Sequence, residues 1–193
     1  MNRTDQKTHD GLRITDHKNF SEESFGFGNT IKYSRFDAEK TRLLSAKGKT
    51  LLLRIPNCLS FGVKKSTKYR KMEFTLPISL DEEFVSIFDT IGEKCYTHVN
   101  NSDGNAMTCL SRNGKSPVLY AKLDDETIFF DENGEPIGHR EYRDLWFRSD
   151  AVVRIESVYA ADDVTSVQMK LHEVWIRSDL PSDETSDSLV SEE

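Results

Sequence analysis

The chain has 193 residues, of which 36% are hydrophobic and 31% are charged, and its formal net charge is −7 at pH 7. No apolar run approaches the roughly 20 residues that cross a bilayer, and residues 1–30 contain no apolar core typical of a signal peptide. We therefore expect an intracellular protein that is not embedded in a membrane, and the three cysteines are not expected to form a disulfide framework.

The chain begins and ends with polar segments that lack the apolar content of a core. Residues 1–28 carry only scattered apolar side chains, so a flexible polar arm is expected there. Residues 178–193 contain six acids and no base, which predicts a disordered acidic C-terminal tail. Residues 29–177 remain, and their length suits one domain with a single core.

The first expected strands and the helix lie before the middle of the chain. Thr50–Ile55 is a short apolar run that Pro56 is expected to stop, and Tyr69–Leu76 alternates between apolar and polar side chains. From residue 80 to residue 99, apolar side chains recur every three or four positions, which predicts an amphipathic helix. Ser79 is its expected N-cap.

Strands are expected again in the second half of the chain. Pro117–Leu123 and Thr127–Phe130 have the composition of extended segments, and Asp131–Gly134 supplies an Asn-Gly pair suited to a hairpin turn. Ala151–Tyr159 and Val164–Ile176 are rich in Val, Ile and Tyr. We predict that these last two segments pair as a closing hairpin.

This order of elements indicates the fold class. About six short strands, with one helix inserted between the early and late groups, predict a mainly β domain. The order fits a Greek-key barrel of the oligonucleotide-binding (OB) type better than an open sandwich. Fold class alone does not define a function.

The sequence contains no convincing catalytic motif. It has no C-x-x-C, no H-E-x-x-H and no phosphate-binding glycine loop, so we expect neither an enzyme nor a bound cofactor or metal. The adjacent acids Asp124, Asp125 and Glu126 could hold Mg²⁺, but three acids between two strands more often form a turn. His172 and Glu173 point to opposite faces of a strand, and His172 is interpreted as a surface histidine.

The charges are distributed unevenly along the chain. Residues 32–71 have a net charge of +10, whereas residues 72–150 have −9 and residues 178–193 have −6. A localised basic block in an acidic protein attracts a polyanion while the rest of the surface repels it. A solvated, lysine-rich face is the simpler explanation for an isolated run of cations.

Aromatic side chains are interleaved with the cations, both in the basic block and in residues 139–148. Single-stranded nucleic acid is held by cations that neutralise phosphates and by flat rings that stack on bases. The predicted nucleic-acid-binding residues are Tyr33, Arg35, Lys49, Arg54, Lys64, Lys65, Lys68, Tyr69, Arg70, Lys71, Arg140, Arg143, Arg148 and Tyr159. Other aromatic residues, Trp146 and Phe147 among them, are explained equally well by packing in the core.

Two of these segments carry a resemblance to a known family. The run from Ser45 to Val63, followed by Tyr69–Leu76, resembles the N-terminal half of the single-stranded DNA-binding proteins of tailed phages and large nucleocytoplasmic DNA viruses. The later order of helix, hairpin, final strand pair and acidic tail is also similar. The resemblance implies an OB-type barrel that coats single strands during replication or recombination, in the host nucleus or a viral replication factory. It also implies that the tail contacts replication proteins and competes with DNA.

Two functions from different classes are consistent with these patterns. The first is a sequence-nonspecific single-stranded DNA-binding protein that acts in viral DNA replication and recombination. The alternative is a protein-interaction module whose basic face docks an acidic partner. A homo-oligomer is compatible with both.

Overall fold

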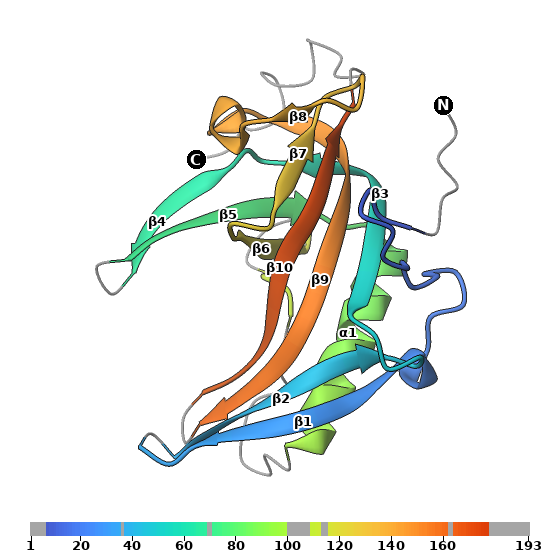
Figure 1. Ribbon diagram of the computed structural model, residues 1–193, viewed down its shortest axis with the longest axis vertical. Coiled ribbons are helices and arrows are strands. Elements are labelled where there is room, and N and C mark those ends of the chain that lie inside the picture. Colours follow the sequence, from blue (N-terminus) through green and yellow to red (C-terminus); the bar gives the residue numbers. More distant parts are fainter. Residues whose placement is uncertain are drawn as a thin grey trace, which may run out of the picture.

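The computed structural model describes residues 7–35, 37–68, 71–99, 109–112, 116–161 and 164–177, with the backbone alone at 66–68 and 71–72 (Figure 1). This part of the chain is mostly β-strand. Its elements are η1 Glu22–Ser24, β1 Phe25–Tyr33, β2 Ala38–Ser45, β3 Leu51–Ser60, β4 Lys64–Lys68, β5 Lys71–Ser79, α1 Glu82–His98, β6 Val118–Leu123, β7 Ile128–Phe130, β8 Pro136–Ile137, η2 His139–Tyr142, β9 Phe147–Ala161 and β10 Val164–Ile176. No helix among the described residues combines the length and the apolar character needed to cross a membrane.

Five of the described strands close into a ring. Going around it, β3 pairs with β5, β5 with β6, β6 with β10, β10 with β9, and β9 again with β3. The β6–β10 pair is parallel and the other four pairs are antiparallel. In the chain, β9 precedes β10, but around the ring β10 lies next to β6 and β9 closes onto β3. This exchange gives the ring Greek-key connections. The predicted mainly β, OB-type fold is confirmed.

Alternation along the strands fills the inside of the ring. Ala151, Val153 and Ile155 of β9 are fully buried. Leu51 and Leu53 of β3 lie opposite Ile155 and Val153 and are equally buried. Residues two apart on a strand share a face, so one apolar face of each ring strand supplies the core.

The predicted helix forms, but it begins later than expected. Ser79 is the last residue of β5, and the N-cap is Asp81, whose carboxylate accepts a hydrogen bond of 3.0 Å from the backbone N–H of Phe84. Phe84, Phe88 and Ile91 are buried on the apolar face of α1. Their spacing of four and three residues places them on one stripe, which packs against the core.

Pro56 does not stop its strand. β3 continues to Ser60, and its register with β9 shifts between Ile55 and Cys58. Pro56 is exposed at this irregularity, and Asn57 has a positive φ of 48°. A bulge accommodates proline because the residues there leave the regular hydrogen-bond ladder, so proline does not remove a required donor.

The predicted turn and the closing hairpin both form. Gly134 N–H donates to the carbonyl of Asp131 (3.1 Å) between β7 and β8, and β9 and β10 pair over most of their length. Two further features were not predicted. The hairpin of β1 and β2 extends the sheet beyond β9, and β4 forms a second hairpin with β5.

Residues 7–28 differ from the flexible arm that the composition predicted. Ile14 is buried against Leu52 and Val152, and the N–H of Thr15 donates to the carbonyl of Leu52 (2.8 Å). β1 already begins at Phe25, which is buried. Leu52 and Val152 point out of the ring, so they need an apolar cover, and this segment provides it. The predicted acidic tail lies outside the described residues.

Gly62 allows two distant segments to approach closely. Its φ is +78°, and a Cβ atom there would lie 2.6 Å from the backbone N and O of Leu145. Beside it, Val63 N–H donates to Tyr142 O (2.9 Å) and Asp144 N–H donates to Val63 O (3.3 Å). The start of β4 is thereby held against the segment that follows η2.

We expect Gly62→Ala to lower the free energy of unfolding by about 2 kcal/mol or more, because the left-handed backbone and the backbone contact both penalise a side chain. Gly48→Ala is the matched control, since Gly48 has a φ of +69° but nothing within 4 Å of a Cβ atom. It should cost only about 1 kcal/mol. Urea denaturation followed by circular dichroism measures both, and equal losses would contradict the close-approach argument.

Candidate functional site

A groove of about 780 Å³ lies on the outer face of the sheet, over β1, β2, β9 and β10 and beside the turn between β6 and β7. We call it the outer-face groove. Its lining includes one tyrosine and several charged residues: Tyr33, Lys40, Arg42, Asp124, Arg154 and Lys170. Figure 1 shows that the β4–β5 hairpin and the β1–β2 hairpin project from the ring toward the same side, with β6 and β10 between them.

Strand register explains why these side chains share a face. Ile31 of β1 is paired with Lys40 of β2, and Lys40 is paired with Tyr159 of β9. Residues directly opposite one another in paired strands project on the same side of a sheet. Tyr159 therefore lies beside Lys40 on the face that carries the groove.

β6 extends this surface toward the second hairpin. Lys122 is paired with Lys170 of β10, and Tyr120 lies two residues before Lys122 on the same strand. The two side chains therefore share the outer face. Tyr120 is 53% exposed, which makes its ring available to a flat ligand.

The floor of the groove is a network of paired charges. Arg154 contacts Asp124 (2.6 Å), Glu156 (3.1 Å) and Glu126, and Lys170 contacts Asp124 (3.1 Å) and Glu156 (3.3 Å). Partial burial alone would raise the pKa of Asp124, but the hydrogen bond from Lys170 and the charge of Arg154 outweigh it and lower that pKa. The cations on the floor are therefore compensated by carboxylates.

The rim on the β1–β2 side is different. Among the described residues, no carboxylate forms an ion pair with Lys40 or Arg42. Ile31 is 56% exposed and Tyr33 is 40% exposed on the neighbouring strand. The rim thus combines uncompensated positive charge with exposed apolar and aromatic surface.

A second concave site lies between the base of the β4–β5 hairpin and η2. Its volume is about 370 Å³, and it is lined by Val63, Lys65, Phe74, His139, Arg140 and Arg143. We call it the hairpin-base pocket. Lys65 and Phe74 are paired directly across the hairpin, so their side chains lie on one face.

The structure gathers only some of the predicted binding residues. Lys65, Arg140 and Arg143 meet in the hairpin-base pocket, and Lys64 is beside them in an ion pair with Asp144 (2.9 Å). Tyr33 and Tyr159 belong to the outer-face surface.

The remaining predicted residues lie elsewhere on the molecule. Arg35 is exposed in the β1–β2 turn and Lys49 in the β2–β3 turn. The guanidinium groups of Arg54 and Arg148 donate to the carbonyls of Lys7 (3.2 Å) and Asn57 (3.4 Å). The described residues of the basic block (residues 32–71) therefore do not line one continuous groove. Successive turns place them at different positions around the ring.

The last four predicted residues of the basic block are Lys68, Tyr69, Arg70 and Lys71. The backbones of Lys68 and Lys71 are paired at the ends of β4 and β5. Tyr69 and Arg70, together with the side chains of Lys68 and Lys71, lie outside the described residues.

His172 is not a surface residue, which corrects its interpretation from the sequence. The register of β10 with β9 shifts between Leu171 and Glu173, so the alternation of side chains breaks at His172. His172 is 6% exposed and Glu173 is fully buried. Both side chains face residues 7–28, the N-terminal segment. His172 Nε2 lies 3.4 Å from Asp10 of this segment.

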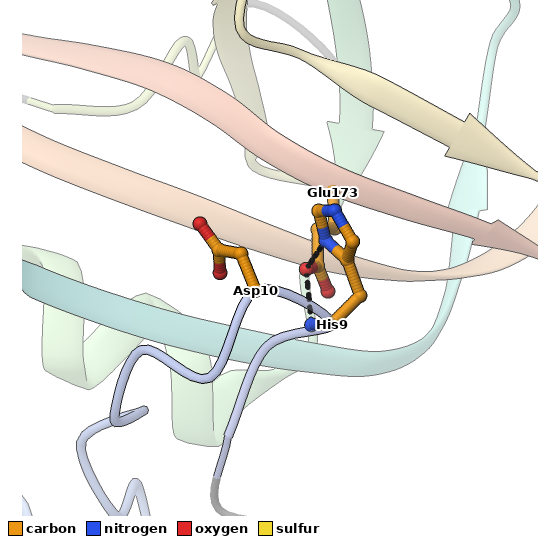
Figure 2. Close-up of side chains that lie close together, drawn as sticks. All are labelled: His9, Asp10 and Glu173. Atoms are coloured by element: carbon orange, nitrogen blue, oxygen red, sulfur yellow. Dashed lines mark hydrogen bonds and ion pairs between the residues drawn. The ribbon is translucent and has the colours of Figure 1, made fainter.

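The same segment brings a histidine and two carboxylates together (Figure 2). The backbone N–H of His9 donates to Glu173 Oε1 (2.7 Å), and His9 Nδ1 lies 2.5 Å from the same oxygen. The other oxygen of Glu173 accepts from Trp175 Nε1 (3.0 Å). Both oxygens of the buried carboxylate are therefore engaged, and the cluster anchors the N-terminal segment to β10.

The acids at the β6–β7 turn behave as predicted. Thr127 N–H donates to Asp124 O (3.1 Å), which closes a turn, and the carboxylate of Asp124 pairs with Arg154 and Lys170.

The sequence analysis did not predict several residues of the outer face, some in the groove and some beside it. Lys40, Arg42, Tyr120 and Lys122 were not selected, although the alternation of Tyr120 and Lys122 with buried Leu119 and Ala121 was visible as a strand signal. The position of Lys40 and Arg42 depended on β2, whose pairing with β9 the sequence did not reveal.

No family model matches this chain, and no curated protein matches it. A similar solved structure is the single-stranded DNA-binding protein from bacteriophage Enc34 in complex with ssDNA, at 12% identity and a TM-score of 0.49, covering 72% of this chain and 91% of that one. Another structure of the Enc34 single-stranded DNA-binding protein has 12% identity and a TM-score of 0.47, covering 76% and 90%. At these values, the function of this chain has to be inferred from its own residues.

We expect Asp124→Asn to destabilise the protein by about 1 to 2 kcal/mol at neutral pH, because it leaves Arg154 and Lys170 with less compensation. Folding lowers the pKa of Asp124, so its contribution is present above the unfolded-state value of about 3.9 and is lost as the pH falls through the folded-state pKa. The difference between variant and parent should therefore shrink on acidification.

Urea denaturation at neutral and acidic pH measures this difference. Asp125→Asn serves as the control, because Asp125 is exposed in the same turn and has no ion pair among the described residues. A pH-independent loss in Asp124→Asn would contradict the charge-network explanation.

Proposed function

We propose that the protein binds single-stranded DNA without sequence specificity in the outer-face groove. The observation that carries the proposal is the rim of the groove, where Lys40 and Arg42 lie uncompensated and Tyr33 exposes its ring. OB folds bind oligonucleotides on the face of their second and third strands and at the loops beside them. Here those ring strands are β5 and β6, and β6 adjoins the groove through its pairing with β10, whose Lys170 lines it.

The division of charge within the groove suggests how a strand would lie. Phosphates require uncompensated cations, which the rim supplies, whereas the carboxylates around Arg154 and Lys170 disfavour phosphates on the floor. Unpaired bases would then stack on the exposed tyrosine rings of the outer face, Tyr33 at the rim and Tyr120 on β6. Stacking of this kind needs bases that are free of a duplex and tolerates any sequence, because every base has a flat face.

The wider role that we propose is coating of single strands during viral DNA replication and recombination. It is supported by the resemblance of Ser45–Val63 and Tyr69–Leu76 to viral single-stranded DNA-binding proteins. The acidic residues 178–193 would contact replication proteins, at the host nucleus or viral factory where the DNA is copied. Self-association of the bound protein would be compatible with this role.

We expect binding of an unstructured oligonucleotide to weaken steeply with salt. If about five phosphates are neutralised, the slope of log affinity against log salt should be near −3.5. Lys40→Ala/Arg42→Ala should reduce the magnitude of the slope by about 1.4 and lower the affinity at low salt roughly tenfold. Fluorescence anisotropy with single-stranded DNA, duplex DNA and RNA at several salt concentrations measures these values.

The matched control for this experiment is Lys7→Ala/Lys18→Ala. Both lysines are exposed, and neither lines the groove. Figure 1 shows the N-terminal segment to which they belong on the opposite side of the ring from β4 and β5. This variant should keep the parent slope. If the protein does not bind the oligonucleotide at low salt, the protein-interaction module is the remaining function. If both double variants lose the same affinity, only the net charge of the protein determines binding.

We expect Tyr120→Ala to lower the affinity for single-stranded DNA about tenfold, since stacking contributes roughly 1 to 3 kcal/mol per base. Tyr120→Phe keeps the ring and should stay within about twofold of the parent. The same titration distinguishes them. A loss of equal size in both variants would show that the hydroxyl group, not the ring face, makes the contact.

A further inference from the structure

The hairpin-base pocket is a separate concave site with its own chemistry. Its lining includes three cations, Lys65, Arg140 and Arg143, and among the described residues it includes no carboxylate. Its volume of about 370 Å³ lies within the range of about 300 to 1,000 Å³ that small-molecule sites occupy. One nucleotide unit is a ligand of suitable size.

The backbone holds the two walls of this pocket in a fixed relation. One wall is the start of β4, and the other is η2 with the residues that follow it. Val63 is bridged to Arg143, with hydrogen bonds from Val63 N–H to Tyr142 O and from Asp144 N–H to Val63 O. The close approach at Gly62 adjoins this bridge. Cations from distant parts of the chain are therefore positioned before any ligand arrives.

The charges in the pocket are only partly compensated. Asp144 pairs with Lys64 (2.9 Å) and lies 3.5 Å from the Nε of Arg143. No ion pair involves Lys65 or Arg140 among the described residues, and both side chains are exposed. Two cations at the mouth of the pocket are thus available to an anionic group.

The less exposed part of the pocket lining is aromatic, and its two rings are inclined to each other by 59°. The ring of Phe74 lies 5.0 Å from that of His139, centroid to centroid. Burial lowers the pKa of His139, and the charge of Arg140 lowers it further, so the imidazole is neutral at neutral pH. His139 Nε2 is buried without a hydrogen-bond partner in the part of the chain that the structure describes. A ligand that inserts a base here would meet the aromatic surface of these two rings.

We propose that the hairpin-base pocket binds a single nucleotide unit, with its phosphate on Lys65 and Arg140 and its base against Phe74 and His139. The phosphate belongs either to a free nucleotide or to the end of a strand, and the recognition chemistry is the same for both. The proposal does not depend on the outer-face groove, because the two sites share no lining residue.

The test is calorimetric titration of the full chain with thymidine 5′-monophosphate, thymidine and inorganic phosphate. The monophosphate should bind at least about tenfold more tightly than thymidine or phosphate alone, because only it engages both parts of the pocket. Lys65→Ala/Arg140→Ala should lower its affinity at least about tenfold. Lys40→Ala/Arg42→Ala, which alters the groove only, should leave it unchanged.

A second arm identifies the source of the phosphate. If the pocket takes a strand end, a 5′-phosphorylated oligothymidylate should bind more tightly than the unphosphorylated one, and Lys65→Ala/Arg140→Ala should abolish the difference. If it takes free nucleotides, the difference is absent while the monophosphate still binds.

The proposal is overturned if the monophosphate fails to bind, if thymidine binds equally well, or if the Lys65→Ala/Arg140→Ala variant binds like the parent. Both replaced side chains are exposed, so the fold should be retained, and circular dichroism checks this. Oligonucleotide binding that survives in this variant would separate failure of the pocket from failure of the groove.

Discussion

The pairing of β9 with three other strands is the constraint on which the rest of the structure depends. β9 joins β3 and β10 within the ring and also carries β2 on its far half. The interior face of this strand supplies the core, and its outer face supplies Arg154 and Glu156 to the groove. One long strand therefore closes the ring and positions the β1–β2 hairpin beside the candidate site.

The inner and outer faces of the closed ring carry different kinds of side chain. The inner face is sealed by apolar side chains, whereas the outer face must be covered or charged. The N-terminal segment covers the apolar part around Leu52 and Val152, and it is held there by Glu173 through His9. The polar part of the outer face remains open as the groove. The buried carboxylate of Glu173 thus helps to determine which part of the ring a ligand can reach.

The acidic composition of the chain is compatible with binding a polyanion because of how the charges are placed. Carboxylates of the acidic middle region are used in ion pairs with Arg154, Lys170, Lys122 and Lys64. These pairs remove positive charge from the floor of the groove and leave it on the rim and in the hairpin-base pocket. The net charge of the protein therefore says little about the local potential at either site.

Local patterns in the sequence determined the mainly β class, the position of the helix, the turn at Asp131–Gly134 and the closing hairpin. Each of these depends on periodicity or turn chemistry over a few neighbouring residues. Only the tertiary structure decided which cations meet. The basic block is contiguous in sequence, yet it passes through β2, β3 and β4, so its members point to different sides of the ring. Lys40 and Arg42 reach the groove through pairing with β9, a strand more than a hundred residues away, and Glu173 is buried because a bulge turns it toward the N-terminal segment. Contacts of this kind depend on strand register between distant segments, which local composition does not encode.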